Sequence, residues 1–517
     1  MKKYDVAVLG GSIGGVLAAL SAAKMGKKAI LTENTDWVGG QFTSQAVPPD
    51  EHKWIEEFGC TKTYREFRDK IRRFYRENYP MKENLKENFD PGLSSVSRLA
   101  HDPRVALHLF KEMLLPFEIS GHIDVRLETR VVSSHVENDT IQFVVVKGKD
   151  EVLESIKADY YIDATDIGEL LPLVGAEYVV GAESREMTGE PHALDTYLPQ
   201  DMQPVTWVAA LEYREGESHI IEKPEMYDYF KAYKQPYGPH SILSHYGPDS
   251  THKCAKEFGV FTDKERGLFP LWSYRRIIAP ENHEKGYALY DVTLLNWPQN
   301  DYFMGNLFEV EDPEKQAFLA QQLTLSFVYW LQTEAPTEDG TLGYPGMKLC
   351  GKSVGTTTGL AKAPYIRESR RIKAKYTITE SEMNAELRED LKVHEDSVGV
   401  GCYHIDLHVT TVTNTFTYWN SWPFELPLGA MIPVRIKNLI PGCKNIGTTH
   451  LTNGCYRLHP VEWNVGEVAG YLSAFCMEKG KTVQEVYEDK ALVKEFQNLV
   501  ISKGVEIHWP ADKVHVI

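Results

Sequence analysis

The sequence predicts an α/β protein in which a Rossmann-like dinucleotide-binding domain carries an inserted, mixed α+β domain. A strand–glycine–helix–strand pattern opens the chain at residues 4–34. A second helix lies close to residue 460, and a loop rich in Gly, Thr and Asn precedes it. Between these patterns, residues 186–424 are rich in Trp, Tyr and Pro and lack a second strand–glycine–helix unit. A chain of 517 residues is long enough for two or three such domains.

The opening segment has the hydrophobic pattern of a βαβ unit. Residues 4–9 run apolar, as a buried parallel strand does. Residues 16–25 predict a helix of small and apolar residues that ends at Gly26, and residues 28–33 predict the second strand. This order of elements brings the first turn and the end of the second strand together, which is where dinucleotides bind.

Four residues of this unit are candidates for contact with a dinucleotide. Gly10 permits the tight turn, Gly15 lets the helix pack close to the strand, and Glu33 would accept hydrogen bonds from ribose hydroxyls. The helix N-terminus would face the pyrophosphate. Ser12 stands at the middle glycine of the G-x-G-x-x-G motif, where its hydroxyl is a candidate phosphate contact. The competing interpretation is a glycine-rich turn in another kind of α/β protein, but the acid after the second strand favours a dinucleotide.

Two further segments favour FAD over NAD. A second glycine pair at residues 39–40, followed by Gln41, lets the backbone approach a long cofactor, although a simple turn is the alternative. A strand at residues 159–162 leads into a small-residue turn that contains Thr165. The strands expected before it include Val131, which is placed to touch the adenine.

The helix near the C-terminus is expected to face the flavin. Pro460 opens this helix, which the pattern predicts to run to Tyr471. Its positive end would stabilise negative charge on the reduced flavin ring. Arg457 and His459 lie at its start and are candidates for stabilising the reduced flavin or for handling a proton. The alternative is that they only cap the helix and order the loop.

These segments together resemble the FAD-dependent oxidoreductase family of the glutathione-reductase-2 structural group, a family of bacterial flavoproteins that are sometimes labelled xanthan-lyase-like. The resemblance spans nearly the whole chain and includes the runs DATDIGELLPLVGAEYVVGAESR, LAKAPYIRESRRI, SVGVGCYHIDLH and NIGTTHLTNGCYRLHPVEWNVGE. It implies bound FAD and a two-domain fold, and it implies no particular substrate. The cofactor contacts that it implies are Gly10, Ser12, Gly15, Glu33, Gly40, Gln41, Val131, Thr165 and the 457–465 region, including Glu462 and Asn464.

The predicted domain organisation is discontinuous. We expect an FAD-binding domain from residues 1–47, 98–185 and 425–485, a helical excursion at 48–97, a substrate or cap domain at 186–424 and a peripheral C-terminal segment at 486–517. The basic run at 367–371 is interpreted as a salt-bridge cluster on a surface helix, with a site for a substrate carboxylate as the alternative.

One predicted strand carries three ionisable side chains on one face. His404, Asp406 and His408 alternate with Tyr403, Ile405 and Leu407, so the polar residues point the same way. We expect His404 and Asp406 to be catalytic and His408 to bind substrate. The alternatives are a hydrogen-bond network beside solvent and a metal site, and no metal is predicted.

Other polar candidates lie in loops. Trp297 is a candidate for stacking on a polyhydroxylated substrate, and Asn300 is a candidate catalytic residue of the same segment. The competing interpretation is a loop ordered by its own turns. Arg98 and His101 form a basic group next to the expected cofactor edge and are candidates for substrate binding.

Composition excludes several classes of partner. The formal net charge of −17 argues against nucleic acid and against an anionic membrane surface. The seven cysteines include no CxxC pair, which is typical of a reducing compartment, and no signal peptide or membrane span is predicted. A cytoplasmic location is therefore expected, and an oligomer is possible.

The absence of both a nicotinamide-type second unit and a CxxC pair indicates that electrons come from the organic substrate. We expect an FAD-dependent oxidoreductase that oxidises a small polar substrate, sugar-derived or hydroxylated, by hydride transfer to flavin N5. Oxygen or another acceptor would take the electrons. The alternatives are a flavin monooxygenase reduced by NAD(P)H and a non-catalytic FAD-binding protein.

Overall fold

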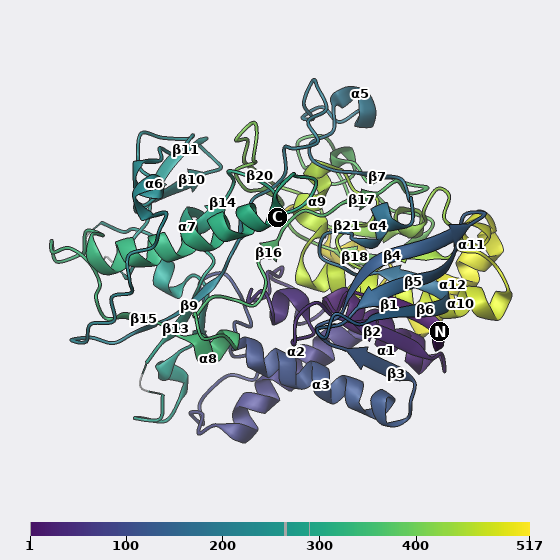
Figure 1. The fold of residues 1–517 in the computed structure, drawn as a ribbon, viewed down its shortest axis with the longest axis horizontal. Helices are drawn as coiled ribbons and strands as arrows, with labels where there is room; N and C mark the ends of the chain where they lie inside the picture. The colour runs from purple at the N-terminus through teal and green to yellow at the C-terminus, as the bar shows by residue number, and fades with distance from the viewer. Residues whose placement is uncertain (1, 263–265, 289) are drawn as a thin grey trace.

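A large sheet occupies one side of the molecule (Figure 1). It is seen in a computed structural model that describes residues 2–262, 266–288 and 290–517. Its strands lie in the order β3-β2-β1-β6-β5-β4, and β22 pairs with the end of β6. Their bounds are β1 (Lys2–Leu9), β2 (Ala29–Thr32), β3 (Ile123–Arg126), β4 (Arg130–Glu137), β5 (Thr140–Lys147), β6 (Leu153–Asp163) and β22 (Leu439–Pro441).

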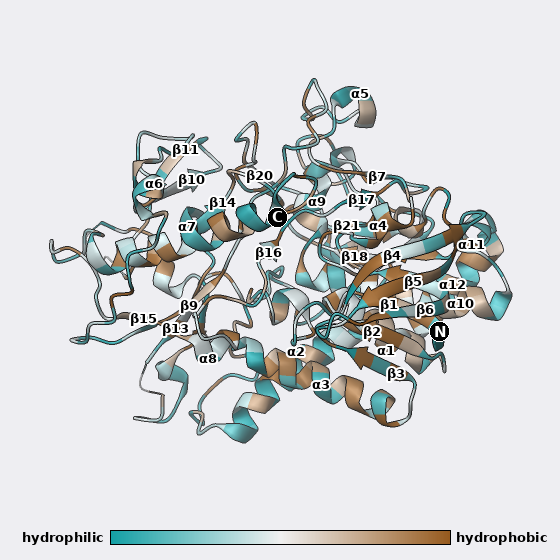
Figure 2. Cartoon of the chain, in the orientation of Figure 1, coloured by the Kyte–Doolittle hydropathy of each residue, from teal (hydrophilic) through white to brown (hydrophobic). Residues whose placement is uncertain are grey.

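The parallel strands of this sheet end at one edge, and that edge carries the site. β1, β2, β3, β6 and β22 are parallel, whereas β4 and β5 form an antiparallel hairpin that continues into β6. The register places Leu9 opposite Asp163, and Asp163 opposite Pro441. Most strand residues are apolar (Figure 2), as strands covered on both faces require. The Rossmann-like α/β class predicted from the sequence is confirmed.

Two helices from opposite ends of the chain pack together without intervening side chains. α1 (Ile13–Lys24) follows β1, and α10 (His459–Lys479) follows β22 after a short helix. A Cβ at Gly466 would overlap the backbone of Gly14, and a Cβ at Gly470 would overlap the backbone of Ala18. α10 runs past Tyr471, where the sequence predicted its end, because its last turns are still buried and Gly480 ends it with a φ of 63°.

The other side of the molecule is built from short antiparallel sheets around a long helix. α7 (Pro313–Thr333) is the long helix in Figure 1 that lies away from the large sheet. The short strands are β8 (Val205–Thr206), β9 (Ala209–Tyr213), β10 (Tyr246–Asp249), β11 (Cys254–Glu257), β12 (Arg276–Ile278), β13 (Val292–Leu295), β14 (Asp301–Tyr302), β15 (Met347–Leu349) and β16 (Tyr365–Ile366). We call this part the cap.

Further strand pairs lie between the cap and the large sheet. They are β7 (Tyr178–Val179) with β17 (Arg371–Ile372), β18 (Ser397–Gly401) with β21 (Phe424–Pro427), and β19 (Ile405–Leu407) with β20 (Thr417–Trp419). The run at 367–371 is buried and extended here, so its interpretation as a surface helix is wrong. Charge pairing with buried carboxylates, described below, allows the arginines to be buried.

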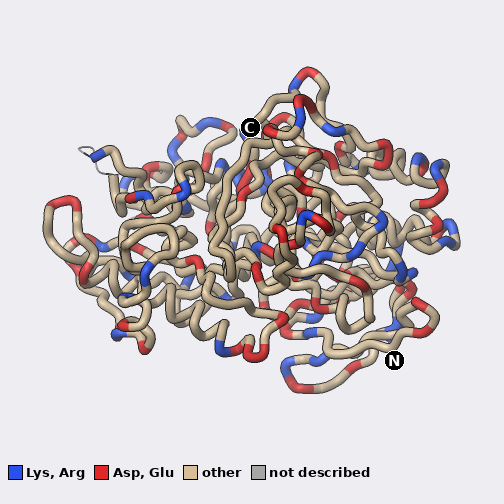
Figure 3. Tube along the Cα trace, turned by 90° about the horizontal axis from the view of Figure 1, so that it is seen from above, with Lys and Arg blue, Asp and Glu red and all other residues tan. Residues whose placement is uncertain are grey.

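The remaining helices surround these sheets. They are α2 (Lys62–Asn78), α3 (Pro103–Ile119), α4 (Leu170–Leu173), α5 (Arg185–Thr188), α6 (Tyr227–Ala232), α8 (Gly351–Val354), α9 (His450–Tyr456), α11 (Val483–Glu488) and α12 (Lys490–Ser502). Acidic and basic residues are interspersed along the chain (Figure 3). Among the described residues, no helix is both long and apolar enough to cross a membrane.

The C-terminal segment reaches back between the two sides of the molecule (Figure 1). Trp509 is buried, and Ile517 exchanges backbone hydrogen bonds with Ser421 at 2.9 and 3.2 Å. The hydroxyl of Ser421 donates to the carbonyl of Tyr403 at 2.6 Å. The segment predicted as peripheral therefore contains buried residues, and Ser421 links it to Tyr403, which precedes β19.

Candidate functional site

The glycine turn after β1 leaves no room for side chains. Gly10 has a φ of 99°, and a Cβ there would overlap the backbone of Ala164 at the end of β6. A Cβ at Gly15 would overlap the carbonyl of Gly10. The Ser12 hydroxyl accepts a hydrogen bond from the backbone N–H of Gly15 at 3.2 Å and so caps α1. Close backbone packing and a capped helix N-terminus are the features that a pyrophosphate site needs.

Glu33 lies directly beside this turn. Its Oε2 accepts a hydrogen bond from the Gly11 N–H at 3.0 Å, and its Oε1 accepts from the N–H and hydroxyl of Thr35, both at 2.8 Å. Burial raises the pKa of Glu33 to about 7, and these hydrogen bonds only partly oppose that effect. A buried acid at the end of the second strand has the position of the ribose-binding residue of dinucleotide folds.

Two other predicted contacts lie at the same edge of the sheet. Thr165 follows β6, and its hydroxyl donates to Asp163 Oδ1 at 2.7 Å. A Cβ at Gly10 would lie 2.5 Å from the Thr165 nitrogen, so the two turns touch. Val131 is buried on β4, in the sheet that carries both turns.

The second glycine pair packs on the first turn. The Gly39 N–H donates to the Gly11 carbonyl at 2.7 Å, and a Cβ at Gly40 would lie 3.0 Å from the Ser12 Cα. Gln41, in the 3-10 turn that follows, donates to the carbonyl of Arg457 at 3.0 Å. This loop therefore connects the nucleotide turn with the start of α10.

Glu462 joins four parts of the chain at the N-terminus of α1. Its Oε1 accepts from the Gly14 N–H at 3.2 Å, and its Oε2 accepts from the amide of Gln41. The Lys444 ammonium lies 3.8 Å from Glu462 and 2.7 Å from Asp166. Lys444 is fully buried, and these two carboxylates outweigh burial and raise its pKa. Sequence reasoning found Glu462 but missed Lys444, for which only its position directly after β22 was a signal.

A continuous series of charged side chains crosses from α9 to the cap. Arg457 NH2 lies 3.1 Å from Asp406 Oδ2, and His408 Nε2 lies 3.5 Å from the same oxygen. His408 Nδ1 lies 2.6 Å from Asp301 Oδ2, and Arg367 donates to Asp301 Oδ1 at 2.9 Å. We call the space around these five residues the recess.

Two of the charged side chains of the recess keep accessible surface although protein surrounds them. The side chains of His408 and Asp406 are 24 % and 15 % exposed, yet burial is the largest single influence on the pKa of each. Burial would raise the pKa of Asp406, but His408 and Arg457 outweigh it and hold the pKa at about 2. Burial and Arg367 act to lower the pKa of His408, but Asp301 and Asp406 outweigh them and raise it.

His404 lies next to this series and differs from His408 in its charge. Its ring lies 4.2 Å from the Tyr418 ring, and burial lowers its pKa. Within the described residues, its buried Nδ1 has no hydrogen-bond partner. Burial thus favours the neutral form of His404, which has one unused ring nitrogen, whereas two carboxylates favour the protonated form of His408.

Arg457 and His459 are held differently, although they lie two residues apart at the start of α10. Arg457 NH1 donates to the Tyr365 hydroxyl at 2.7 Å, while its buried Nε has no partner in the described chain. Both ring nitrogens of His459 contact backbone, at the Val47 carbonyl (3.1 Å) and the Asp50 N–H (3.4 Å). Burial lowers the pKa of His459 to about 3. The structure joins Arg457 to the recess and ties His459 to the loop before α2.

The remaining candidates do not join the charged series. Asn300 donates to the Leu295 carbonyl at 3.0 Å and accepts from the Trp297 N–H at 2.9 Å, so both order their own loop. His101 is buried, and its ring lies 5.6 Å from Phe42, whereas Arg98 is exposed. Asn464 donates to the Val398 carbonyl at 3.1 Å.

Several residues of the recess were missed or misplaced by sequence reasoning. Asp301, directly after Asn300, carries the charge that pairs with both His408 and Arg367. Another missed pair is Arg275 with Asp50, whose contacts are 2.9 and 3.1 Å long. No local motif marks these residues, because their partners lie far away along the chain. Among the described residues, no group of three or more His, Cys, Asp or Glu could hold a metal ion.

The residues around the turn and the recess fit FAD. The glycine turns offer the side-chain-free backbone that a pyrophosphate requires, and Glu33 lies where a ribose would bind. Among the described residues, Gln41 Oε1 and both polar side-chain atoms of Gln45 are buried without partners. Unused amide groups of this kind match the N–H and C=O groups of a flavin ring.

Taken together, the fold and this site define a flavin-dependent α/β enzyme class. The model of the FAD dependent oxidoreductase family matches residues 5–500, and the chain belongs to this family. FAD is therefore its cofactor, as the sequence predicted. No curated protein matches the chain.

The solved structures that match this chain are remote in sequence. A geranylgeranyl bacteriochlorophyll reductase-like protein from Thermoplasma acidophilum is 12 % identical over 98 % of this chain and 84 % of its own, with a TM-score of 0.34. A myxobacterial chondrochloren halogenase is 11 % identical over 99 % of this chain and 84 % of its own, with a TM-score of 0.35. A bacillithiol disulfide reductase from Bacillus cereus is 18 % identical over 32 % of this chain and 41 % of its own, with a TM-score of 0.21.

Proposed function

We propose that this protein oxidises a small polar organic substrate, hydroxylated or sugar-derived, which binds in the recess. The observation that carries the proposal is the charged series from Arg457 to Arg367, which keeps accessible surface and begins at the residue whose carbonyl Gln41 contacts. Bound FAD supplies the two-electron acceptor of the reaction. The electron acceptor that restores it is oxygen or another small molecule, and a cytoplasmic location stays a prediction.

The side chains of the recess divide the work between binding and proton transfer. Arg457 keeps an unused Nε–H, and His408 is held protonated between two carboxylates. These cations would bind and orient the oxygen atoms of a polar substrate. His404 is neutral and has an unused ring nitrogen, so it is the group best suited to take a proton from a substrate hydroxyl. Asp406 fixes Arg457 and His408 and stays ionised.

An anaerobic titration of the FAD-loaded protein tests the reaction class. NADH, NADPH and then sugars, hydroxy acids and amines would be added while the flavin absorbance is followed. Bleaching by one organic class with inert nicotinamides is the expected result. Rapid bleaching by NAD(P)H would replace the proposal with a monooxygenase, and slow reduction by every donor would replace it with a non-catalytic FAD-binding protein.

A pair of histidine variants tests the role of His404. We expect His404→Gln to slow flavin reduction by the identified substrate at least about 100-fold, because general-base catalysis contributes that much or more. His135→Gln is the matched control, since His135 lies on β4 with its side chain 49 % exposed. Equal reduction rates in both variants would remove His404 from the mechanism.

A further inference from the structure

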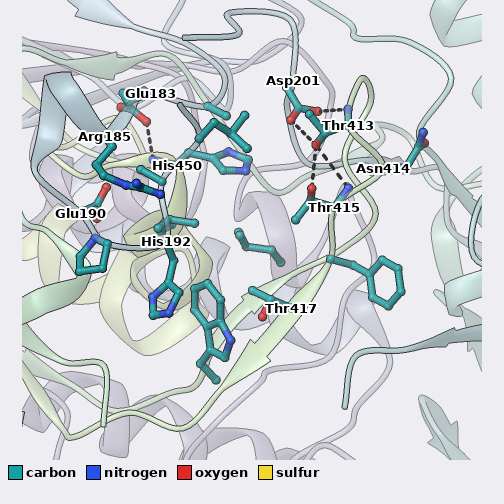
Figure 4. Close-up of a pocket in the computed structure, with 18 of the residues that line it drawn as sticks. Glu183, Arg185, Glu190, His192, Asp201, Thr413, Asn414, Thr415, Thr417 and His450 are labelled. Atoms are coloured by element: carbon teal, nitrogen blue, oxygen red, sulfur yellow. Dashed lines mark hydrogen bonds between the residues drawn. The ribbon is translucent and has the colours of Figure 1, made fainter. Parts of the chain in front are cut away.

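A cavity lies on the far side of β19 from the recess. Its volume is about 550 Å³, and it lies between the 182–194 segment, the 413–419 segment and the start of α9 (Figure 4). Leu407 of β19 lines it. Asp406 and His408, the neighbours of Leu407, point to the opposite side, because successive side chains of a strand alternate. The two spaces are therefore separate.

One side of this cavity presents cations. His450 Nδ1 lies 2.9 Å from Glu368, which leaves the Nε2 at the other end of the ring for the cavity that His450 lines. Burial lowers the pKa of His450, but Glu368 outweighs it and raises the pKa. Arg185 lies on the same side (Figure 4). Its only described ion pair is with Asp195 at 3.5 Å, and that carboxylate is 90 % exposed, so the pair is weak.

The acids that line the cavity are already occupied by the protein itself. Glu183 accepts from Arg371 at 2.9 Å and from the backbone N–H of His450 at 2.9 Å. Asp201 accepts from the N–H groups of Val412 and Thr413 and from the Thr413 hydroxyl. Burial raises the pKa of a third acid, Glu190, to about 7, which weakens its negative charge near neutral pH. The acids are thus satisfied by the protein, whereas the weakly paired Arg185 and the Nε2 of His450 are left for a ligand.

The rest of the wall is apolar and partly flat. Trp419 lines the cavity, and its ring lies 4.6 Å from the ring of His192. Leu407, Phe416 and Leu451 complete the apolar surface. An aromatic ring on such a wall gains both burial and stacking.

We propose that this cavity is a second small-molecule site, which takes a carboxylate with a flat apolar body. The carboxylate lies between Arg185 and His450, and the body lies against Trp419. This ligand is distinct from the substrate in the recess, and the proposal does not depend on the reaction assigned there.

Calorimetric titration of the FAD-loaded protein with 2-naphthoate and with its neutral amide tests the proposal. The two probes share a body and differ in the charge that Arg185 and His450 would recognise. We expect one molecule of naphthoate to bind per chain at least about tenfold more tightly than the amide, because a charge-assisted hydrogen bond contributes that much. Trp419→Phe should weaken both probes.

Two arginine variants locate the bound probe. Arg185→Gln should abolish the preference for the acid, and this change is tolerable because the side chain is 56 % exposed. Arg388→Gln is the matched control, since Arg388 does not line the cavity, and should leave the preference intact. Equal affinity for acid and amide, no binding of either, or a preference that survives Arg185→Gln would each overturn the proposal. If the preference survives and the probe also shifts the flavin absorbance, the probe has bound in the recess.

Discussion

Around the nucleotide turn, Gly14 and Gly466 bring the backbones of two helices together, whereas in the recess Asp301 and Asp406 hold their neighbours by charge. The first region depends on the absence of side chains, and the second depends on the protonation of a few of them. The helix packing at the nucleotide turn should therefore be sensitive to added volume. The recess should tolerate changes of shape better than changes of charge.

The largest effect is expected from Asp301→Asn. The change keeps the size of the side chain but leaves Arg367 and His408 without their shared carboxylate, and losing one partner of a buried pair costs about 3–5 kcal/mol. Chemical denaturation at pH 7 measures the loss. Asp390→Asn, with a side chain 81 % exposed, is the control and should cost less than about 1 kcal/mol.

The pH dependence of the stability lost in Asp301→Asn tests whether charge is the cause of the loss. Burial would raise the pKa of Asp301, but Arg367 and His408 outweigh it and lower the pKa. The stability that ionised Asp301 contributes is fully present above its unfolded pKa of about 4. It is lost as the pH falls through the lower pKa of the folded state. The contribution of His408, whose pKa is raised, is complete below about pH 6.5 and is lost as the pH rises through the folded value. A cost of Asp301→Asn that grows on acidification would contradict the charge-based account.

A smaller but still large effect is expected from Gly466→Ala. The added methyl group would overlap the Gly14 backbone, and such overpacking costs about 3 kcal/mol. Because Gly14 belongs to the nucleotide turn, the purified protein should also lose FAD, which absorbance at constant protein concentration measures. Gly121→Ala is the control: its φ of 74° strains an alanine, but a Cβ there meets nothing within 4 Å, so this variant should keep its FAD. Retention of FAD by Gly466→Ala would show that this helix contact can be relaxed.

Glu33→Gln should weaken FAD binding about tenfold, or about 1.4 kcal/mol, because an amide replaces two acceptor oxygens with one. Since the pKa of Glu33 is raised to about 7, the difference from the wild type should grow between pH 6 and pH 8. Fluorescence titration of the FAD-free protein measures the dissociation constant. Asp36→Asn, whose side chain is 51 % exposed, is the control with little expected change.

The smallest effect is expected from His459→Gln. It removes contacts with the Val47 carbonyl and the Asp50 N–H, worth about 1 kcal/mol. The pKa of His459 is lowered to about 3, so the ring stays neutral and the pH profile of flavin reduction should keep its shape. If the pH profile of flavin reduction lost one of its limbs in this variant, His459 rather than His404 would be the group that accepts the proton.

The nucleotide turn could be predicted because its signals are local. Gly10, Ser12, Gly15 and Glu33 lie within one βαβ unit, and each is required by backbone geometry that the sequence expresses directly. The family resemblance supplied the distant contact at Glu462, and the structure adds its bond to Gly14. Local motifs thus carried most of the prediction on this side.

The recess could be predicted only in part. The alternation of His404, Asp406 and His408 placed them on one face, and the structure puts His408 and Asp406 in contact. Asp301 could not be inferred, because its role comes from β14 meeting β8 and from a histidine 107 residues away. The sequence indicated the neighbouring Asn300 instead, which forms hydrogen bonds within its own loop. Charge pairs between distant segments leave no pattern in a single sequence.

The bond between Gly14 and Glu462 joins residues that are 448 positions apart. At typical rates of synthesis, about 5–20 residues per second, roughly 20–90 s separate their emergence from the ribosome. Throughout that interval β1 and α1 exist without the helix that packs on them, while the cap is made in between. The flavin site is thus among the last parts of the protein to be completed, and loading of FAD follows translation of α10.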